Sequence, residues 1–125
     1  MNAKILVVDD SGLARRTLRQ MLEREGHTVE EATDGASAIE RYFINRHEVV
    51  LLDMVMEGMY GLEVLRKVRE LNPEARVIVA TADIQQATRE EVQAAGAAAL
   101  INKPFNRDEV VRVLETVLQG GIVWT

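Results

Sequence analysis

The stretch Ile5-Leu6-Val7-Val8-Asp9-Asp10 decides the fold of this chain, because four apolar residues run directly into two carboxylates. Such a run, rich in β-branched residues and apolar on both faces, is typical of a buried parallel strand. Three further runs end on polar residues in the same way: 49–52 at Asp53, 77–80 at Thr81, and 97–101 at Asn102 and Lys103. The carboxyl ends of parallel strands share one sheet edge, where open α/β sheets bind ligands, so we expect these polar residues to meet there.

Segments of helical periodicity separate the apolar runs. The predicted helices cover residues 11–26, 35–45, 61–71, 83–96 and 108–120, with Ser11 and Asp83 as N-caps and glycines at the ends of the first, fourth and fifth. A weaker strand is predicted at residues 28–32, at the edge of the sheet. Five strands alternating with five helices predict an α/β domain with helices on both faces of a parallel sheet.

The composition excludes several classes of protein. The chain has 125 residues, enough for one domain, and its 47% hydrophobic content is ordinary for a folded protein. A net charge of −5 argues against direct binding to nucleic acid. The absence of cysteine excludes disulfides and thiolate chemistry, and no segment resembles a signal peptide or a membrane span. We therefore expect a cytoplasmic protein with no membrane partner.

The polar residues at the strand ends predict a metal site. Asp9, Asp10 and Asp53 bring three negative charges against one positive charge from Lys103. At about 4 Å and an effective dielectric constant near 20, each pair of carboxylates repels by roughly 4 kcal/mol. Either one carboxyl has a raised pKa or the site recruits a cation. All these ligands are oxygens, which favours Mg²⁺, and a divalent ion also prepares the site for a phosphoryl group.

Asp53 is the best candidate for a nucleophile, because it ends a central strand and a loop follows it. A carboxylate that attacks phosphorus forms an aspartyl phosphate, which is a recognised covalent route. Thr81 is placed to donate to one phosphoryl oxygen, and Lys103 to pair with another.

The chain resembles the receiver domains of two-component response regulators, most closely the single-domain, chemotaxis-type members. The resemblance covers essentially residues 4–119, and four motifs in order make it highly specific. They are Asp9-Asp10-Ser11, then Asp53 with Met56 and Gly61, then Thr81-Ala82, and finally Lys103-Pro104-Phe105. The resemblance implies a flavodoxin-like (βα)5 doubly wound parallel sheet with strand order 2-1-3-4-5.

The resemblance also implies roles for individual residues. Asp53 accepts a phosphoryl group from a phosphohistidine, on a histidine kinase or a phosphotransfer protein. The Mg²⁺ ligands are the carboxylates of Asp10 and Asp53 and the backbone carbonyl of Val55, with Asp9 assisting through water. Thr81 and Lys103 contact the phosphoryl group. The bond before Pro104 is expected to be cis.

Three positions depart from the family pattern. Leu100 stands where most members carry a Phe or Tyr that swings inward on phosphorylation, and Thr81 and Leu100 are the expected switch residues. Glu57 replaces the usual proline, and Tyr60 replaces a residue that is more often acidic. These departures suggest an alternative, a degenerate receiver that binds its partner without phosphorylation.

Two other classes of protein fit the sequence less well than a receiver domain does. A phosphatase of the haloacid dehalogenase type needs a second Asp two residues after the nucleophile, where this chain has Val55. A flavodoxin needs a phosphate loop after the first strand, where Asp9 and Asp10 would repel the phosphate. We therefore expect no enzyme beyond self-phosphorylation and slow autodephosphorylation. The expected organisation is a receiver at residues 1–119 and a separable tail or linker at residues 120–125, acting on an output protein or a C-terminal output domain.

Overall fold

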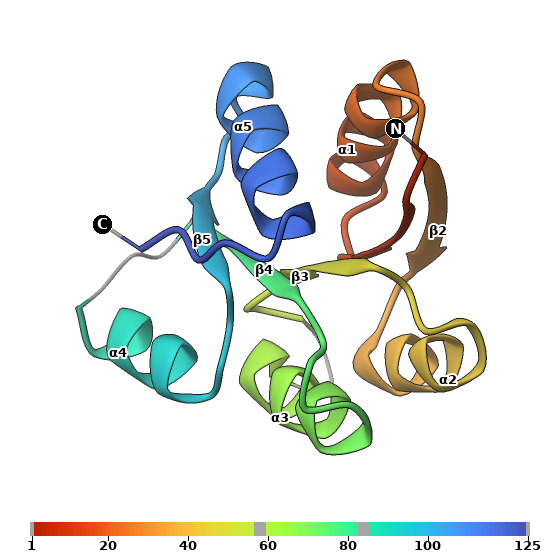
Figure 1. Cartoon of the computed structure of the whole chain (residues 1–125). Helices are drawn as coiled ribbons and strands as arrows, with labels where there is room; N and C mark the ends of the chain where they lie inside the picture. The colour runs from red at the N-terminus through yellow and green to blue at the C-terminus, as the bar shows by residue number, and fades with distance from the viewer. Residues whose placement is uncertain (1, 57–59, 83–85, 125) are drawn as a thin grey trace.

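Five strands alternate with five helices in the computed structural model, which describes residues 2–56, 60–82 and 86–124 (Figure 1). The strands are β1 (Lys4–Val8), β2 (Thr28–Ala32), β3 (Val49–Asp53), β4 (Val77–Thr81) and β5 (Ala99–Asn102). The helices are α1 (Gly12–Arg24), α2 (Gly35–Asn45), α3 (Gly61–Leu71), α4 (Gln86–Ala94) and α5 (Arg107–Leu118). Glu57 and the predicted cap Asp83 lie outside the described residues.

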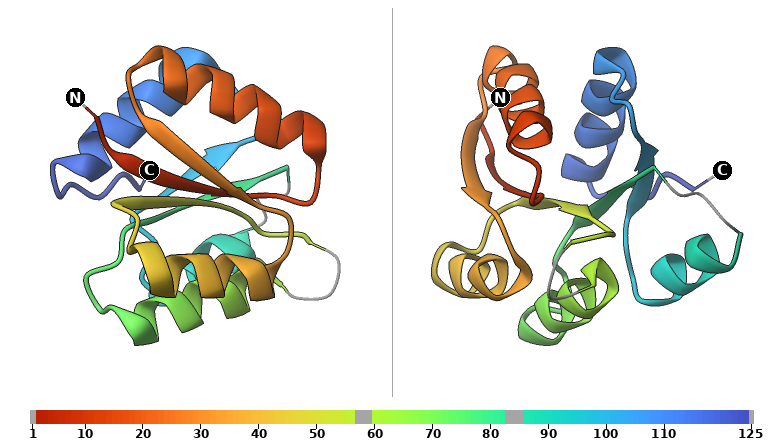
Figure 2. Two further views of the ribbon diagram at one scale, coloured as in Figure 1. Left: turned by 90° about the vertical axis from the view of Figure 1, so that its right-hand side faces the viewer. Right: turned by 180° about the vertical axis from the view of Figure 1, so that it is seen from behind.

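The strands form one parallel sheet in the order β2-β1-β3-β4-β5. Helices α1 and α5 cover one face, and α2, α3 and α4 cover the other (Figures 1 and 2). This arrangement confirms the predicted flavodoxin-like, doubly wound fold. None of the described helices has the length and apolar character needed to cross a membrane.

The central strands are buried on both faces, as their continuous apolar sequences predicted. In β1, Leu6 and Val8 pack on the side of α2, α3 and α4, whereas Ile5 and Val7 pack on the side of α1 and α5. Every residue of β3 and β4 is buried as well. Side chains on a strand alternate between the two faces, so a slip of one residue would move every side chain into the opposite core. The loss of packing that such a slip would cause fixes the register of the strands. A fixed register in turn fixes the polar residues at the strand ends.

The residues predicted to cap or end the described helices agree with the structure. The predicted first residue of β5 differs from the observed one. The Ser11 hydroxyl accepts a hydrogen bond from the N–H of Ala14 at 3.2 Å, and Gly26 follows α1 with a φ of 90°. The fifth strand was predicted to begin at residue 97 but begins at Ala99. The reason is that the N–H of Ala97 donates to a carbonyl of α4 and so belongs to the end of that helix.

The described residues after α5 pack on the domain, in the segment 120–125 that the sequence predicted to be a tail or the start of a linker. Val123 forms a parallel bridge with Ala99, the first residue of β5. The Trp124 indole donates to the carbonyl oxygen of Ala97 at 3.0 Å. The described part of this segment therefore lies along the outer edge of β5 and packs with the domain.

Helix α3 begins where the backbone after β3 leaves no room for a side chain. The N–H of Gly61 donates to the carbonyl of Met54 at 3.0 Å, which turns the chain back beside the strand. A Cβ on Gly61 would lie 2.8 Å from the Cα of Met54 and closer still to the carbonyl oxygen of Asp53. The glycine is therefore required by the backbone that carries the end of β3.

Gly61→Ala should destabilise the protein by roughly 1–3 kcal/mol, because the backbone around Asp53 must shift to admit the methyl group. Gly12→Ala is a matched control, since a Cβ there would meet no atom closer than 3.7 Å and the residue lies at the start of a helix. The control should leave stability unchanged or raise it by up to about 1 kcal/mol. Urea unfolding measures both variants, and equal stabilities would contradict the close approach.

Candidate functional site

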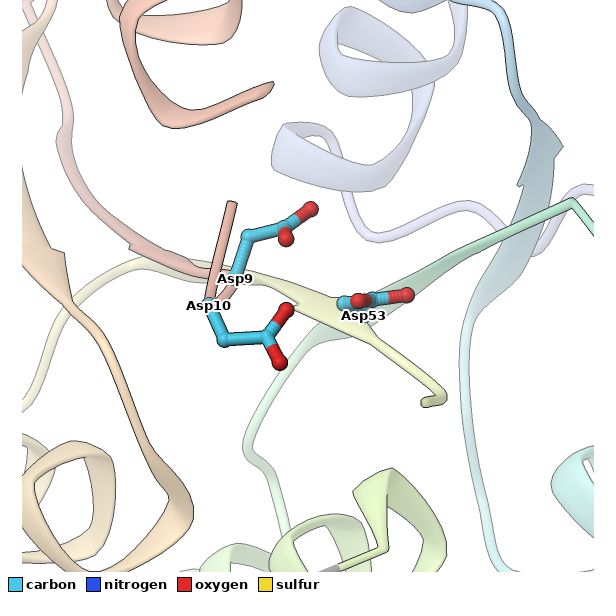
Figure 3. Close-up of side chains that lie close together, drawn as sticks. All are labelled: Asp9, Asp10 and Asp53. Atoms are coloured by element: carbon cyan, nitrogen blue, oxygen red, sulfur yellow. The ribbon is translucent and has the colours of Figure 1, made fainter. Parts of the chain in front are cut away.

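Three carboxylates meet where β1 and β3 end. Asp9 and Asp10 follow β1, Asp53 is the last residue of β3, and Figure 3 shows the three side chains gathered in one small region. One oxygen from each carboxylate lies within 4.8 Å of the other two. Asp9 and Asp53 are 2% and 6% exposed, whereas Asp10 is exposed. The cluster is therefore buried on one side and reaches solvent at Asp10.

Lys103 joins the cluster from the loop after β5. Its Nζ donates to Asp9 Oδ2 at 2.8 Å and lies 3.5 Å from Asp53 Oδ1. Its backbone N–H donates to the carbonyl of Thr81 at 3.0 Å, which places the side chain above the neighbouring strands. Burial alone would lower the pKa of Lys103, but the hydrogen bond that it donates to Asp9 and the charges of both carboxylates outweigh burial and raise it. The lysine therefore stays a cation. The expected cis bond to Pro104 is present.

Asp9 is held at both of its carboxylate oxygens. The N–H of Ser11 donates to Oδ1 at 2.9 Å, and Lys103 binds Oδ2. By contrast, the Lys103 ammonium and the N–H of Val55, at 3.4 Å, both contact the same oxygen of Asp53, Oδ1. Asp9 thus has the more fixed carboxylate, and Asp53 keeps its contacts on one side.

The charge balance of the cluster suits a hard cation. The pKa of Asp53 is raised, first because burial disfavours its charged form and then because Asp9 carries a like charge nearby. The charge of Lys103 and the hydrogen bond from Val55 oppose this rise without cancelling it. The donors are all carboxylate oxygens, and the exposed side at Asp10 gives an ion a path to them. This donor set fits Mg²⁺ better than a soft metal.

The remaining predicted site residues lie on β4, on β5 and in the loop after β3. Thr81 is buried at the end of β4, next to β3, and pairs in register with Asn102. Val55 follows Asp53 closely and its side chain is 62% exposed. Leu100 lies earlier in β5, partly buried against the core formed with α2, α3 and α4. The structure therefore brings Asp9, Asp10, Asp53 and Lys103 together and puts Leu100 away from them.

One supporting residue of the site was missed by sequence reasoning. Arg15 belongs, with Arg16 and Arg19, to a basic stripe on α1 beside the site. The sequence favoured a solvated face for this stripe and left open a role in steering an acidic or phosphorylated partner. Its Nη1 donates to the backbone carbonyl of Asp9 at 2.8 Å, and its Nε pairs with Glu31 of β2 at 3.0 Å. Arg19 also pairs with Glu31. No local pattern reveals these contacts, because they depend on how α1 crosses the edge of the sheet.

Comparison with known proteins agrees with this geometry. The family model for the response regulator receiver domain matches residues 5–115. Over 116 residues the chain is 40% identical to the transcriptional regulatory protein ResD of Bacillus subtilis, which covers 93% of this chain and 48% of that protein. Over 118 residues it is 35% identical to the chemotaxis protein CheY of Thermotoga maritima, with 94% and 98% covered. The CheX–CheY–BeF₃–Mg²⁺ complex of Borrelia burgdorferi aligns with a TM-score of 0.89 and 30% identity, over 92% of this chain and 88% of that one.

The chain belongs to the receiver domains of two-component response regulators. Receiver domains are signalling modules that use Mg²⁺ and interact with kinases and output domains. The chain spans about half the length of ResD and nearly all of the Thermotoga CheY. The family therefore applies to the whole unit that carries the carboxylate cluster.

Asp53→Asn should raise the free energy of unfolding in metal-free buffer at neutral pH, by roughly 1–3 kcal/mol, because it removes one of three clustered like charges. The raised pKa of Asp53 in the folded state means that the folded state binds the extra proton, so wild-type stability falls as the pH rises through that pKa. The advantage of the variant should therefore grow with pH. Urea unfolding in EDTA over a range of pH measures it.

Glu70→Gln is the control for this experiment, because that carboxylate is exposed on α3. It should change stability by less than about 0.5 kcal/mol at every pH. An Asp53→Asn variant less stable than the wild type in EDTA would show that the cluster is not repulsive.

Proposed function

We propose that Asp53 accepts a phosphoryl group from the phosphohistidine of a histidine kinase or of a phosphotransfer protein. The observation that carries this proposal is the placement of a buried Asp53 within 3.5 Å of the Lys103 ammonium and beside two further carboxylates. A cation-binding cluster and a lysine around one nucleophilic carboxylate are the groups that phosphoryl transfer requires.

The chemical step is a displacement at phosphorus. An oxygen of Asp53 attacks the phosphorus atom, the P–N bond to the histidine breaks, and the imidazole keeps the electron pair and takes a proton from solvent. Lys103 pairs with one phosphoryl oxygen, and the hydroxyl of Thr81 donates to another. When bound, Mg²⁺ supplies positive charge against the phosphoryl oxygens, held by Asp10, Asp53 and the Val55 carbonyl, with Asp9 acting through water. In this view the domain promotes only its own phosphorylation and slow autodephosphorylation.

The output of the proposed module is a change in partner binding. We expect the Thr81 hydroxyl to move toward the phosphoryl group, because an unpaired phosphoryl oxygen in a partly buried site is costly. Leu100 then changes rotamer at most, and the movement centres on residues 81–85, of which 83–85 lie outside the described residues. The partner reads the surface of α4, β5 and α5 and is an output protein or an output domain.

The proposed setting is cytoplasmic. The receiver unit comprises residues 1–119, followed by a C-terminal tail or the start of a linker at residues 120–125, and it binds neither nucleic acid nor membrane directly. The net charge of −5 supports the expectation that the domain binds neither nucleic acid nor membrane, because anionic polymers and anionic lipid surfaces repel an acidic domain.

A receiver that binds its partner without phosphorylation is the second candidate. Leu100 favours it, because this side chain is already partly buried and carries no ring to move between two positions. The complete set of Asp9, Asp10, Asp53, Thr81 and Lys103 favours the phosphorylated module, since a constitutive binder needs none of these groups.

Acetyl phosphate with Mg²⁺ should add one phosphoryl group to the wild type, as detected by intact mass. Asp53→Asn should take up none, and EDTA should abolish the reaction. Asp10→Asn should slow the reaction by at least about tenfold, because it removes one fixed oxygen ligand for Mg²⁺. Asp108→Asn, an exposed acid in the first turn of α5, is the control and should behave as the wild type. Full Mg²⁺-dependent phosphorylation of Asp53→Asn would overturn the assignment of Asp53 as the nucleophile. A wild type that takes up no phosphoryl group would favour the second candidate.

Val55→Asn should shorten the lifetime of the phosphorylated protein at least several-fold, because an amide at this position can hold a water for attack on the acyl phosphate. The wild-type side chain is apolar and exposed, and it offers that water no hydrogen bond. Val55→Ala is the matched control and should keep the wild-type decay rate. The loss of phosphorylated protein after removal of the donor measures both, and an unchanged rate for Val55→Asn would refute the steric and polar reasoning.

A further inference from the structure

The segment at residues 122–124, here called the tail, pairs with the sheet as the start of a sixth strand would. Its Val123 bridges Ala99 in parallel, and the N–H of Val123 donates to the carbonyl of Ala98 at 2.8 Å. Side chains alternate as in a sheet, because Val123 packs against the α1 and α5 core and Trp124 against the α2, α3 and α4 core. The tail thus pairs with the outer edge of β5, the last strand of the sheet (Figure 1).

The reversal that lays the tail on this edge depends on two glycines. Gly120 has a φ of 90°, a conformation that other residues rarely adopt. The N–H of Gly121 donates to the carbonyl of Thr116 at 2.9 Å. A Cβ on Gly121 would lie 2.7 Å from Thr116 Cγ2 and 3.0 Å from the Thr116 carbonyl oxygen. A side chain at position 121 would therefore displace the tail while leaving β5 itself unaltered.

The tail also places an aromatic ring beside Leu100. Trp124 is partly buried, and its indole N–H donates to the carbonyl of Ala97. Trp124 and Leu100 line the same hollow of about 110 Å³, together with Arg89 of α4 and Arg112 of α5. The tail therefore covers part of the surface formed by α4, β5 and α5. This is the surface through which we propose that the domain meets its output partner.

We propose that the tail is an intramolecular occupant of this surface, that phosphorylation of Asp53 favours its release, and that an output partner competes with it. This inference rests on the proposed function. The tail is held by few contacts, and its Ile122 is 72% exposed. Leu100 and Asn102 line the same hollow as Trp124, and Asn102 is the register partner of Thr81. A partner that takes the place of the indole meets a hollow lined by Arg89 and Arg112 as well as by Leu100.

The inference has a reciprocal consequence. If phosphorylation favours the released tail, then a released tail favours the phosphorylated state by the same factor. A variant with an undocked tail should therefore bind a phosphoryl mimic more tightly than the wild type. No partner needs to be known for this comparison.

Trp124 is the single tryptophan of the chain, so its fluorescence reports on the tail. Adding Mg²⁺ and beryllium fluoride to the wild type should shift the emission to longer wavelength and increase quenching by acrylamide. Asp53→Asn should show neither change. Gly121→Ala should show the shifted emission without any mimic, and Ile122→Ala, which alters an exposed side chain, should match the wild type.

Calorimetry of beryllium fluoride binding in the presence of Mg²⁺ tests the coupling. Gly121→Ala and Trp124→Ala should both bind at least about fivefold more tightly than the wild type and Ile122→Ala. Trp124→Ala removes the contact without straining the backbone, so agreement between the two variants excludes misfolding. Unchanged fluorescence in a wild type that binds the mimic overturns the tail inference and leaves the proposed function intact. Equal affinities in all variants also overturn it, and a wild type that binds no mimic and takes up no phosphoryl group overturns both.

Discussion

The bond between Lys103 and Asp9 is the contact on which the site depends. Lys103 follows β5 at one edge of the sheet, and Asp9 follows β1, with β4 and β3 between them. The lysine reaches Asp9 only if all four strands end at one edge of the sheet and the loop after β5 holds the lysine backbone over the neighbouring strands. The strand register and the bond from the Lys103 N–H to the Thr81 carbonyl meet these two conditions.

Holding these buried carboxylates close together has a cost in stability, and the same cost underlies the proposed affinity of the site for a cation. Burial of Asp9 and Asp53 removes water that would otherwise screen them, and one ammonium offsets only part of their charge. The raised pKa of Asp53 expresses this imbalance. A site that were already neutral would gain little from Mg²⁺ or from the metal-bound phosphoryl group. On the proposed function, the same repulsion destabilises the resting fold and favours the binding of a cation.

Much of this was predictable from the sequence, because the informative signals are local. Apolar runs mark buried strands, and in a parallel sheet the residue after each run falls on one edge, which brought Asp9, Asp53 and Lys103 together. Contacts that depend on how elements cross were not predictable. Arg15 reaches the Asp9 carbonyl only because α1 lies over β2, and Trp124 reaches Ala97 only because the chain reverses after α5. The sequence favoured a solvated basic stripe for Arg15 and left open whether Trp124 packs on the domain or leads into a further segment.

The docked tail covers part of an open sheet edge, and it also occupies part of the surface proposed for partner binding. An edge strand exposes backbone N–H and C=O groups that pair readily with other chains, and β5 is such an edge. The bond from the Val123 N–H satisfies the carbonyl of Ala98, at the start of this edge. A partner that approaches β5 therefore meets backbone groups and a hollow that the chain itself already uses. Protection of the edge and competition for it follow from the same few hydrogen bonds, so any change that loosens the tail also opens the surface.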